Sequence, residues 1–125
     1  MLSNATIMAF IATTNAAKAR PFYEEVLGLP VKRTDSYAIV FNSNGIELRM
    51  TTVKELLPAP YSVMSWIVPD IHRTIDGLMA KGVNFEKYSF FEQDPVGVWT
   101  APDGTQVAWF KDPDGNLLSL TQYMA

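Results

Sequence analysis

The chain has 125 residues, a formal net charge of −3 and no cysteine, which suits one small domain and excludes disulfides, thiolate nucleophiles and thiolate metal sites. Its 10 Lys and Arg residues are scattered, so the concentrated basic face that nucleic-acid binding needs is missing. No apolar run approaches the roughly 18 residues of a membrane span, and the N-terminus lacks the charged region of a signal peptide. We therefore expect a cytoplasmic protein that binds neither nucleic acid nor membrane.

The first half of the chain, residues 6–52, is predicted to fold as a strand, a helix and three further strands. An apolar, β-branched strand over 6–13 precedes Asn15, whose side chain suits the N-cap of a helix that ends at Gly28. Pro21 lies inside this helix, so the helix either begins late, with Pro21 in its first turn, or is kinked. The remaining strands are expected over 31–34, 37–42 and 46–52, with a tight Asn-Ser-Asn-Gly turn before the last.

The second half, residues 62–123, repeats this order. A strand over 62–68 leads to Asp70, the expected N-cap of a helix that ends at Gly82. Later strands are expected over 83–87, 105–111 and 117–123, and two Pro-Asp-Gly turns flank the middle one. The predicted class is therefore α+β, built from two βαβββ modules.

Two such modules side by side are expected to form a concave groove of mixed sheets, with the helices outside. A sheet with one helix covers only one of its faces, and concave surfaces at the junction of repeated units commonly hold small molecules. The aperiodic stretch 87–98 is interpreted as a flap over this groove.

Four segments resemble the vicinal oxygen chelate superfamily, which includes lactoylglutathione lyases, extradiol dioxygenases, fosfomycin resistance enzymes, epimerases and non-enzymatic bleomycin resistance proteins. They read PFYEEVLGLPV, GIELRM, KGVNF and WFKDPDGNLLSL. The resemblance covers nearly the whole chain, from Thr6 to Gln122, and implies one glyoxalase-like domain over residues 1–125, commonly a homodimer. These segments mark a fold and say little about chemistry.

The resemblance also implies where a metal would bind. Metal-dependent members take His or Glu ligands from the first and last strand of each half, and the corresponding positions here are Met8, Glu47, Val63 and Ser119. Only Glu47 is a strong ligand for a divalent ion, because a thioether is soft, valine has no donor atom and a hydroxyl is weak. A catalytic ion needs about three protein ligands, so no metal and no other cofactor is expected.

The groove is expected to be mainly apolar, with one charged spot. Glu47 and Arg49 share a strand face opposite Leu48 and Met50. Either Arg49 holds a ligand carboxylate or phosphate while Glu47 acts as a base or orients a ligand donor, or the two pair with each other or with neighbours at the rim. For the apolar positions, ordinary core packing is the alternative to ligand contact. The expected ligand-binding residues are Met8, Phe10, Glu47, Arg49, Val63, Trp99, Trp109 and Ser119, with Phe90 and Phe91 as further aromatic walls.

Five other residues are assigned structural roles. His72, the only histidine, is interpreted as a solvated residue in the first turn of the second helix. Trp66 is expected to pack on the helix side of its sheet and Tyr23 in the core. Asp112, like Asp114 in the same motif, is expected to bond local backbone N–H groups in a turn.

The sequence leaves three functions open. The favoured one is a small-molecule binding protein of the glyoxalase and bleomycin resistance family without a catalytic metal. The alternative is a lyase, isomerase or dioxygenase relative with an atypical site, in which Glu47 is the best candidate base and Arg49 stabilises an oxyanion. A partner-binding module is the third, and no interaction motif favours it. Whether the chain is an enzyme is not decided by its residues.

Overall fold

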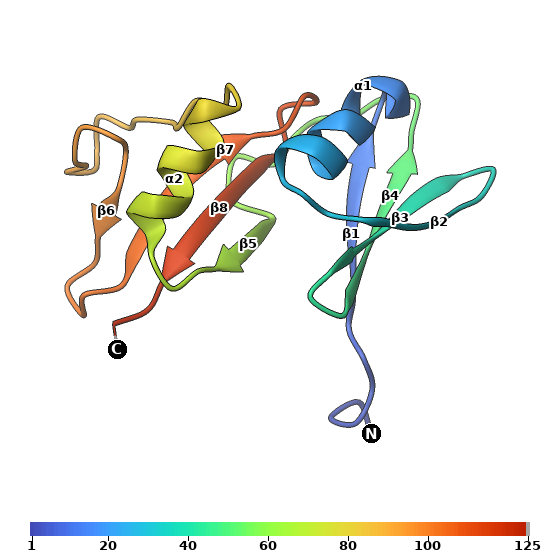
Figure 1. The fold of residues 1–125 in the computed structure, drawn as a ribbon, viewed down its shortest axis with the longest axis horizontal. Coiled ribbons are helices and arrows are strands. Elements are labelled where there is room, and N and C mark those ends of the chain that lie inside the picture. Colours follow the sequence, from blue (N-terminus) through green and yellow to red (C-terminus); the bar gives the residue numbers. More distant parts are fainter. Residues whose placement is uncertain (125) are drawn as a thin grey trace. The chain divides into compact units, whose positions relative to one another are not determined.

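A computed structural model describes residues 1–124 of the chain. They form two compact units, Met1–Leu57 and a second that begins at Pro58, and the boundary lies in a proline-containing connector (Figure 1). Each unit contains one strand, a helix and three more strands, and these four strands form one sheet. The predicted βαβββ order is thus present twice, and the fold belongs to the α+β class.

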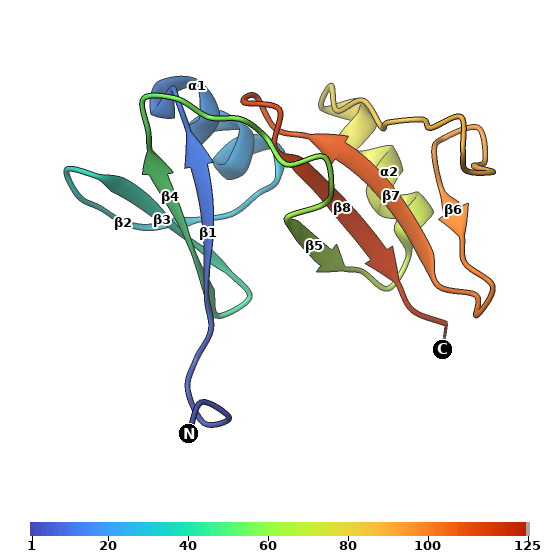
Figure 2. The ribbon, with the colours of Figure 1, turned by 180° about the vertical axis from the view of Figure 1, so that it is seen from behind.

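The first unit contains a mixed four-stranded sheet. Its strands are β1 (Met8–Thr13), β2 (Val31–Thr34), β3 (Ala38–Ser43) and β4 (Ile46–Thr52). They lie in the order β1-β4-β3-β2, where β1 and β4 are parallel and the other pairs antiparallel (Figure 2). Asn44 and Gly45, with φ of 50° and 90°, form the two-residue turn between β3 and β4. Two positive φ angles are what a type I′ hairpin turn requires, so an Asn-Gly pair suits this position.

The first helix changes its winding at a proline. It begins as α1 (Ala16–Pro21), where the Asn15 side chain accepts a hydrogen bond from the Lys18 N–H at 3.2 Å as predicted. Pro21 is the last residue of α1, and the chain continues as a π-helical turn, η1 (Phe22–Val26). Because proline has no N–H to donate, the regular helical bonding is interrupted at this point. The late start considered from the sequence is therefore wrong, and the helix is irregular at Pro21 instead.

The second unit repeats the strand order of the first. Its elements are β5 (Met64–Ile67), α2 (Ile71–Ala80), β6 (Trp99–Thr100), β7 (Gln106–Lys111) and β8 (Leu117–Gln122). The sheet runs β5-β8-β7-β6, with β5 and β8 parallel and the other pairs antiparallel. This order corresponds strand for strand to β1-β4-β3-β2.

Both ends of α2 are capped as the sequence predicts. The Asp70 carboxylate accepts the Arg73 N–H at 3.1 Å, which satisfies one of the free donors of the first turn. At the other end, Gly82 adopts a φ of 93°, and the Val83 N–H donates to the Leu78 carbonyl at 3.1 Å. This closing pattern needs a left-handed residue, which glycine adopts without steric strain.

The strand predicted over 83–87 is absent, and this prediction is wrong. Only Phe85 in that stretch forms a bridge, an isolated one with Phe110 of β7, and the outer strand of the sheet is β6. The Gln93 side chain donates to the Glu86 carbonyl at 3.0 Å and accepts the Tyr88 N–H at 2.7 Å. These side-chain bonds satisfy backbone groups that a continuous strand would have paired with β7.

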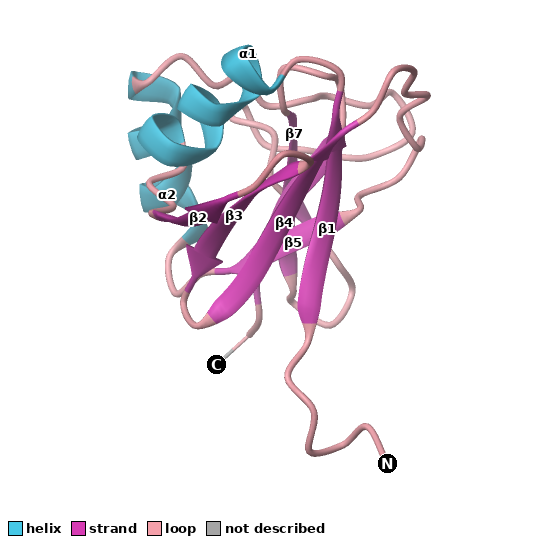
Figure 3. Ribbon diagram, turned by 90° about the vertical axis from the view of Figure 1, so that its right-hand side faces the viewer, coloured by secondary structure: helices cyan, strands magenta, loops and turns pink. Residues whose placement is uncertain are grey.

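Each unit has its own core between its helix and one face of its sheet. Figure 3 shows α1 beside the strands of the first unit. In the first, Tyr23 is fully buried with its ring centroid 5.6 Å from that of Phe41. In the second, Trp66 stacks on buried Phe110 at 6.4 Å. The predicted core role of Tyr23 and the helix-side placement of Trp66 are therefore confirmed. Among residues 1–124, none of the helices has the length and apolar character needed to cross a membrane.

Candidate functional site

Four of the predicted ligand residues share one face of the first sheet. In the parallel register of β1 and β4, Met8 is paired with Glu47 and Phe10 with Arg49. Leu48 and its neighbours on the opposite face are buried in the core, whereas Phe10 exposes 64% of its surface. The face of this sheet that points away from the core therefore carries two exposed apolar side chains beside two charged ones.

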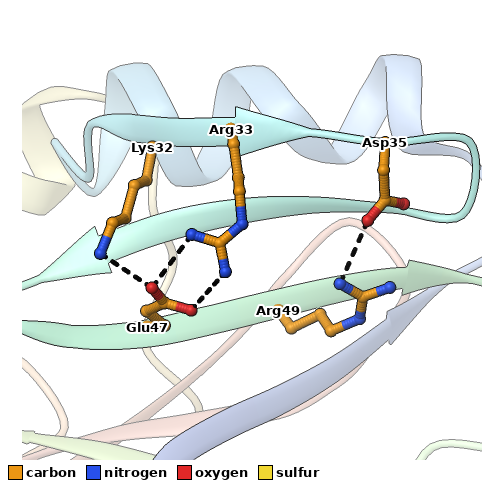
Figure 4. A network of polar contacts seen from close by, with 5 residues as sticks. All are labelled: Lys32, Arg33, Asp35, Glu47 and Arg49. Atoms are coloured by element: carbon orange, nitrogen blue, oxygen red, sulfur yellow. Dashed lines mark hydrogen bonds and ion pairs between the residues drawn. The ribbon is translucent and has the colours of Figure 1, made fainter.

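A β-bulge in β2 brings two cationic side chains to Glu47. Val31 is paired with Phe41 and Arg33 with Val40, so Lys32 is an extra residue in the ladder. Strand alternation normally places consecutive side chains on opposite faces, and a bulge redirects them. Here Lys32 and Arg33 both reach the Glu47 carboxylate (Figure 4).

The contacts to Glu47 occupy both of its carboxylate oxygens. Lys32 Nζ lies 2.8 Å from Oε2, Arg33 Nη1 lies 3.1 Å from Oε2, and Arg33 Nη2 lies 2.7 Å from Oε1. The hydrogen bonds from Arg33 and Lys32 lower the pKa of Glu47 to about 2 and, in return, the bonds to Glu47 raise the pKa of Arg33. Glu47 is thus ionised near neutral pH and is a weak proton acceptor.

Arg49 pairs with a different carboxylate. Its Nη1 lies 3.3 Å from Asp35 Oδ2, and Asp35 also accepts the backbone N–H groups of Tyr37 and Ala38 at 2.8 Å. The Tyr37 N–H is the main cause of the lowered pKa of Asp35. Glu47 and Arg49 therefore pair with neighbours and not with each other, which was one of the two predicted alternatives.

The second sheet carries the other four predicted residues. Trp109 is paired with Ser119, and Trp99 with Val107, so both indoles lie on the face opposite Trp66. Ser119 is 3% exposed, and its hydroxyl lies 2.8 Å from that of Ser62. Val63 is exposed just before β5, where its N–H donates to the Leu117 carbonyl.

Rings from the segment after α2 cover the two indoles. Phe91 stacks on Trp109 with centroids 5.2 Å apart and planes 4° apart, and it also lies 4.9 Å from Trp99. Phe90 is 4.7 Å from Phe91, and Tyr88 meets Trp109 edge-on at 5.7 Å. The two phenylalanines considered from the sequence as aromatic walls thus join Trp99 and Trp109 in one cluster.

A surface pocket of about 430 Å³ lies beside this cluster. Its lining includes Phe90, Phe91, Glu92, Asp94, Val98 and Trp99. Sequence reasoning missed the two carboxylates, because the stretch 87–98 has no strand or helix period that shows which side chains gather. The only available signal was the Asp94-Pro95 pair, which is typical of a turn.

His72 contacts this pocket segment from α2. Its ring is exposed, as predicted, and its Nε2 lies 2.7 Å from Asp94 Oδ2, a contact that the sequence did not indicate. Asp94 Oδ1 also accepts the N–H groups of Val96 and Val98. Burial acts to raise the pKa of Asp94, but the bonds from His72 and the two amides outweigh it, and the pKa is lowered.

Comparison with known proteins identifies the family. The model of the Glyoxalase/Bleomycin resistance protein/Dioxygenase superfamily matches residues 5–120. The chain belongs to this superfamily. A search of curated proteins finds no match to the sequence.

Solved structures of the superfamily share the fold at low sequence identity. A glyoxalase family protein from Enterococcus faecalis has a TM-score of 0.75 and 21% identity, covering 97% of this chain and 99% of that one. A genomically encoded fosfomycin resistance protein from Listeria monocytogenes scores 0.75 at 13% identity, with 97% and 94% covered. Lactoylglutathione lyase from Agrobacterium tumefaciens scores 0.72 at 15% identity, with 94% and 93% covered. At these identities the likeness establishes the fold.

The four positions that the family resemblance implies for a metal do not fit a catalytic ion. Both oxygens of Glu47 are bonded to cationic side chains, and Ser119 is buried against the Ser62 hydroxyl. Met8 and Val63 supply no hard donor atom. Among residues 1–124, no group of three or more His, Asp or Glu side chains is placed to hold a metal ion.

Proposed function

We propose that this chain is a non-catalytic member of the superfamily that binds an organic small molecule without a catalytic metal. The observation that carries the proposal is the double contact of Lys32 and Arg33 with Glu47, the one strong ligand among the four family positions. A divalent ion at Glu47 would have to displace, or lie beside, two positive charges, and like charges at such distances repel strongly.

The face of the first sheet that points away from the core supports recognition of an organic anion. Met8 and Phe10 offer exposed apolar surface, and Arg49 lies beside them in the register of β1 and β4. Three cations (Lys32, Arg33 and Arg49) and two carboxylates (Asp35 and Glu47) leave this network with one excess positive charge. Arg49 has one ion pair among the described residues, so most of its five donors are available for a ligand carboxylate or phosphate.

The second sheet supports apolar contact with an organic ligand. Trp99 and Trp109 are aromatic side chains partly covered by Phe91, Val63 is exposed, and the Ser119 hydroxyl is bonded to that of Ser62. We also propose that a ligand contacts these four residues. The cytoplasmic location and the homodimer expected by resemblance belong to the same proposal.

The alternative of a lyase, isomerase or dioxygenase relative would require Glu47 to accept a proton as general base. A pKa of about 2 is far below the neutral range in which a general base works best. The contacts of Glu47 therefore favour binding over turnover, with Glu47 as the partner of Lys32 and Arg33.

Calorimetric titration of the untagged chain with Mn²⁺, Ni²⁺ and Zn²⁺ tests the proposal. We expect no tight, stoichiometric binding, and the same weak heats from Glu47→Gln, which is nearly isosteric and uncharged. One ion bound tightly per chain by the wild type, and lost in Glu47→Gln, would contradict the proposal and restore the metalloenzyme alternative.

A further inference from the structure

The pocket beside the aromatic cluster combines rings with carboxylates. Phe90, Phe91 and Trp99 supply three aromatic side chains, Glu92 and Asp94 supply two carboxylates, and the lining contains no lysine or arginine. Its volume of about 430 Å³ falls within the range of roughly 300–1,000 Å³ that is usual for small-molecule sites.

The rings hold one another in place and leave surface for a ligand. Phe91 is fixed by stacking on Trp109 and by its contact with Trp99, while Phe90 lies against Phe91 with 74% of its surface exposed. The face of an aromatic ring carries partial negative charge, which attracts a cation placed over it, and tryptophan does so most strongly.

The carboxylates of Glu92 and Asp94 have different roles. Asp94 is held by the N–H groups of Val96 and Val98 and by His72, so it shapes the wall of the pocket. Glu92 is exposed and forms no ion pair or hydrogen bond with the described residues, so none of their cationic side chains lies within 4 Å of its carboxylate. A negative charge beside aromatic faces, without a local counterion, is the arrangement that recognises an organic cation.

Hydrogen bonds of the Gln93 side chain hold the pocket segment in shape. Its amide nitrogen donates to the Glu86 carbonyl at 3.0 Å and to the Gly97 carbonyl at 2.7 Å, and its oxygen accepts the Tyr88 N–H at 2.7 Å. A preformed pocket loses less conformational entropy on binding than one that must order first.

We propose that this pocket binds an organic cation, a quaternary or protonated amine attached to an apolar or aromatic group. The cationic head contacts the faces of Trp99 and Phe90 and is attracted by Glu92, while the apolar group packs against Phe91 and Val98. This site goes beyond the proposed function and uses none of Met8, Glu47 or Arg49, so the metal titration and the test below can fail independently.

The test uses benzyltrimethylammonium as the probe and the full ¹⁵N-labelled chain. The three tryptophans give three indole N–H signals, and we expect the Trp99 signal to shift on titration while that of Trp66, on the other sheet face, stays unchanged. Benzyl alcohol, which keeps the ring and lacks the charge, should bind about fivefold more weakly, and benzenesulfonate more weakly still.

Two variants separate the pocket from general charge attraction. Glu92→Gln should weaken binding of the probe about threefold and reduce its dependence on salt. Glu55→Gln is the matched control, because Glu55 is also exposed but lies in the first unit. Trp99→Leu should weaken binding at least about fivefold, and its spectrum reports whether the sheet is intact.

Three results would overturn the proposal. The first is an unshifted Trp99 signal at millimolar probe. The second is equal affinity for benzyl alcohol and benzyltrimethylammonium, which would indicate apolar contact alone. The third is equal weakening by Glu92→Gln and Glu55→Gln, which would place the cation elsewhere on the acidic surface.

Discussion

One extra residue in β2, Lys32, sets the chemistry of the Glu47 side chain on β4. Without the extra residue at Lys32, strand alternation would direct only one of the two cations of β2 toward Glu47. With it, Arg33 makes a two-point contact and Lys32 a third, and the carboxylate is held in its charged form. The carboxylate that could otherwise bind a metal ion or accept a proton is therefore bonded to Lys32 and Arg33.

The pKa of Glu47 predicts a specific pH dependence of stability. Its value of about 2 in the folded chain is below the ordinary 4.5, so the ionised contact stabilises the fold above pH 4.5 and is lost as the pH falls toward 2. Urea unfolding of the wild type and Glu47→Gln, followed by far-UV circular dichroism, should show the full stability difference at pH 7 and almost none near pH 2. A difference that stays constant over this range would show that the glutamine variant loses something other than the charge.

At the scale of elements, the ends of α2 depend on single residues. Asp70 satisfies the Arg73 N–H at the first turn, and its negative charge also suits the positive end of the helix dipole. Asp76 lies on the exposed side of the same helix and forms no hydrogen bond or ion pair with the described residues. Replacing each aspartate in turn therefore distinguishes the effect of the N-cap hydrogen bond of Asp70 from the effect of any carboxylate on this helix.

We expect Asp70→Ala to lower the free energy of unfolding by about 1 kcal/mol, the usual effect of losing an N-cap. Asp76→Ala should change it by less than about 0.5 kcal/mol, because the site is exposed and alanine favours helix. Denaturant unfolding at neutral pH measures both. Equal losses from the two variants would mean that the cap contributes nothing beyond charge.

At the scale of the molecule, the first sheet leaves an apolar edge exposed. β1 is the edge strand, and Ile7 and Phe10, beside and within it, are largely exposed. An uncharged, apolar edge strand readily pairs with another chain. The homodimer expected from the family resemblance stays a prediction, and β1 is the strand at which we expect two copies to pair.

Light scattering of the purified chain should give twice the monomer mass of 14.0 kDa. Phe10→Lys should shift the mass toward the monomer, because a charge on the edge opposes pairing. Tyr37→Lys is the control, since Tyr37 is exposed in a turn outside β1. A wild-type mass of 14.0 kDa would contradict the dimer, and equal dissociation by both variants would contradict the role of β1.

The sequence by itself determined the repeated βαβββ order, the caps at Asn15 and Asp70, and the strand faces that carry Glu47 and Arg49. These features depend on neighbours a few residues apart, so local periodicity and capping preferences reveal them. Only the tertiary structure decided that Glu47 is bonded by side chains 14 and 15 residues away, and that Asp94 meets His72 across 22 residues. It also decided that β6, rather than residues 83–87, completes the second sheet. Such pairings form when segments distant in the sequence pack together. The periodicity of the sequence does not indicate which side chains will then be neighbours.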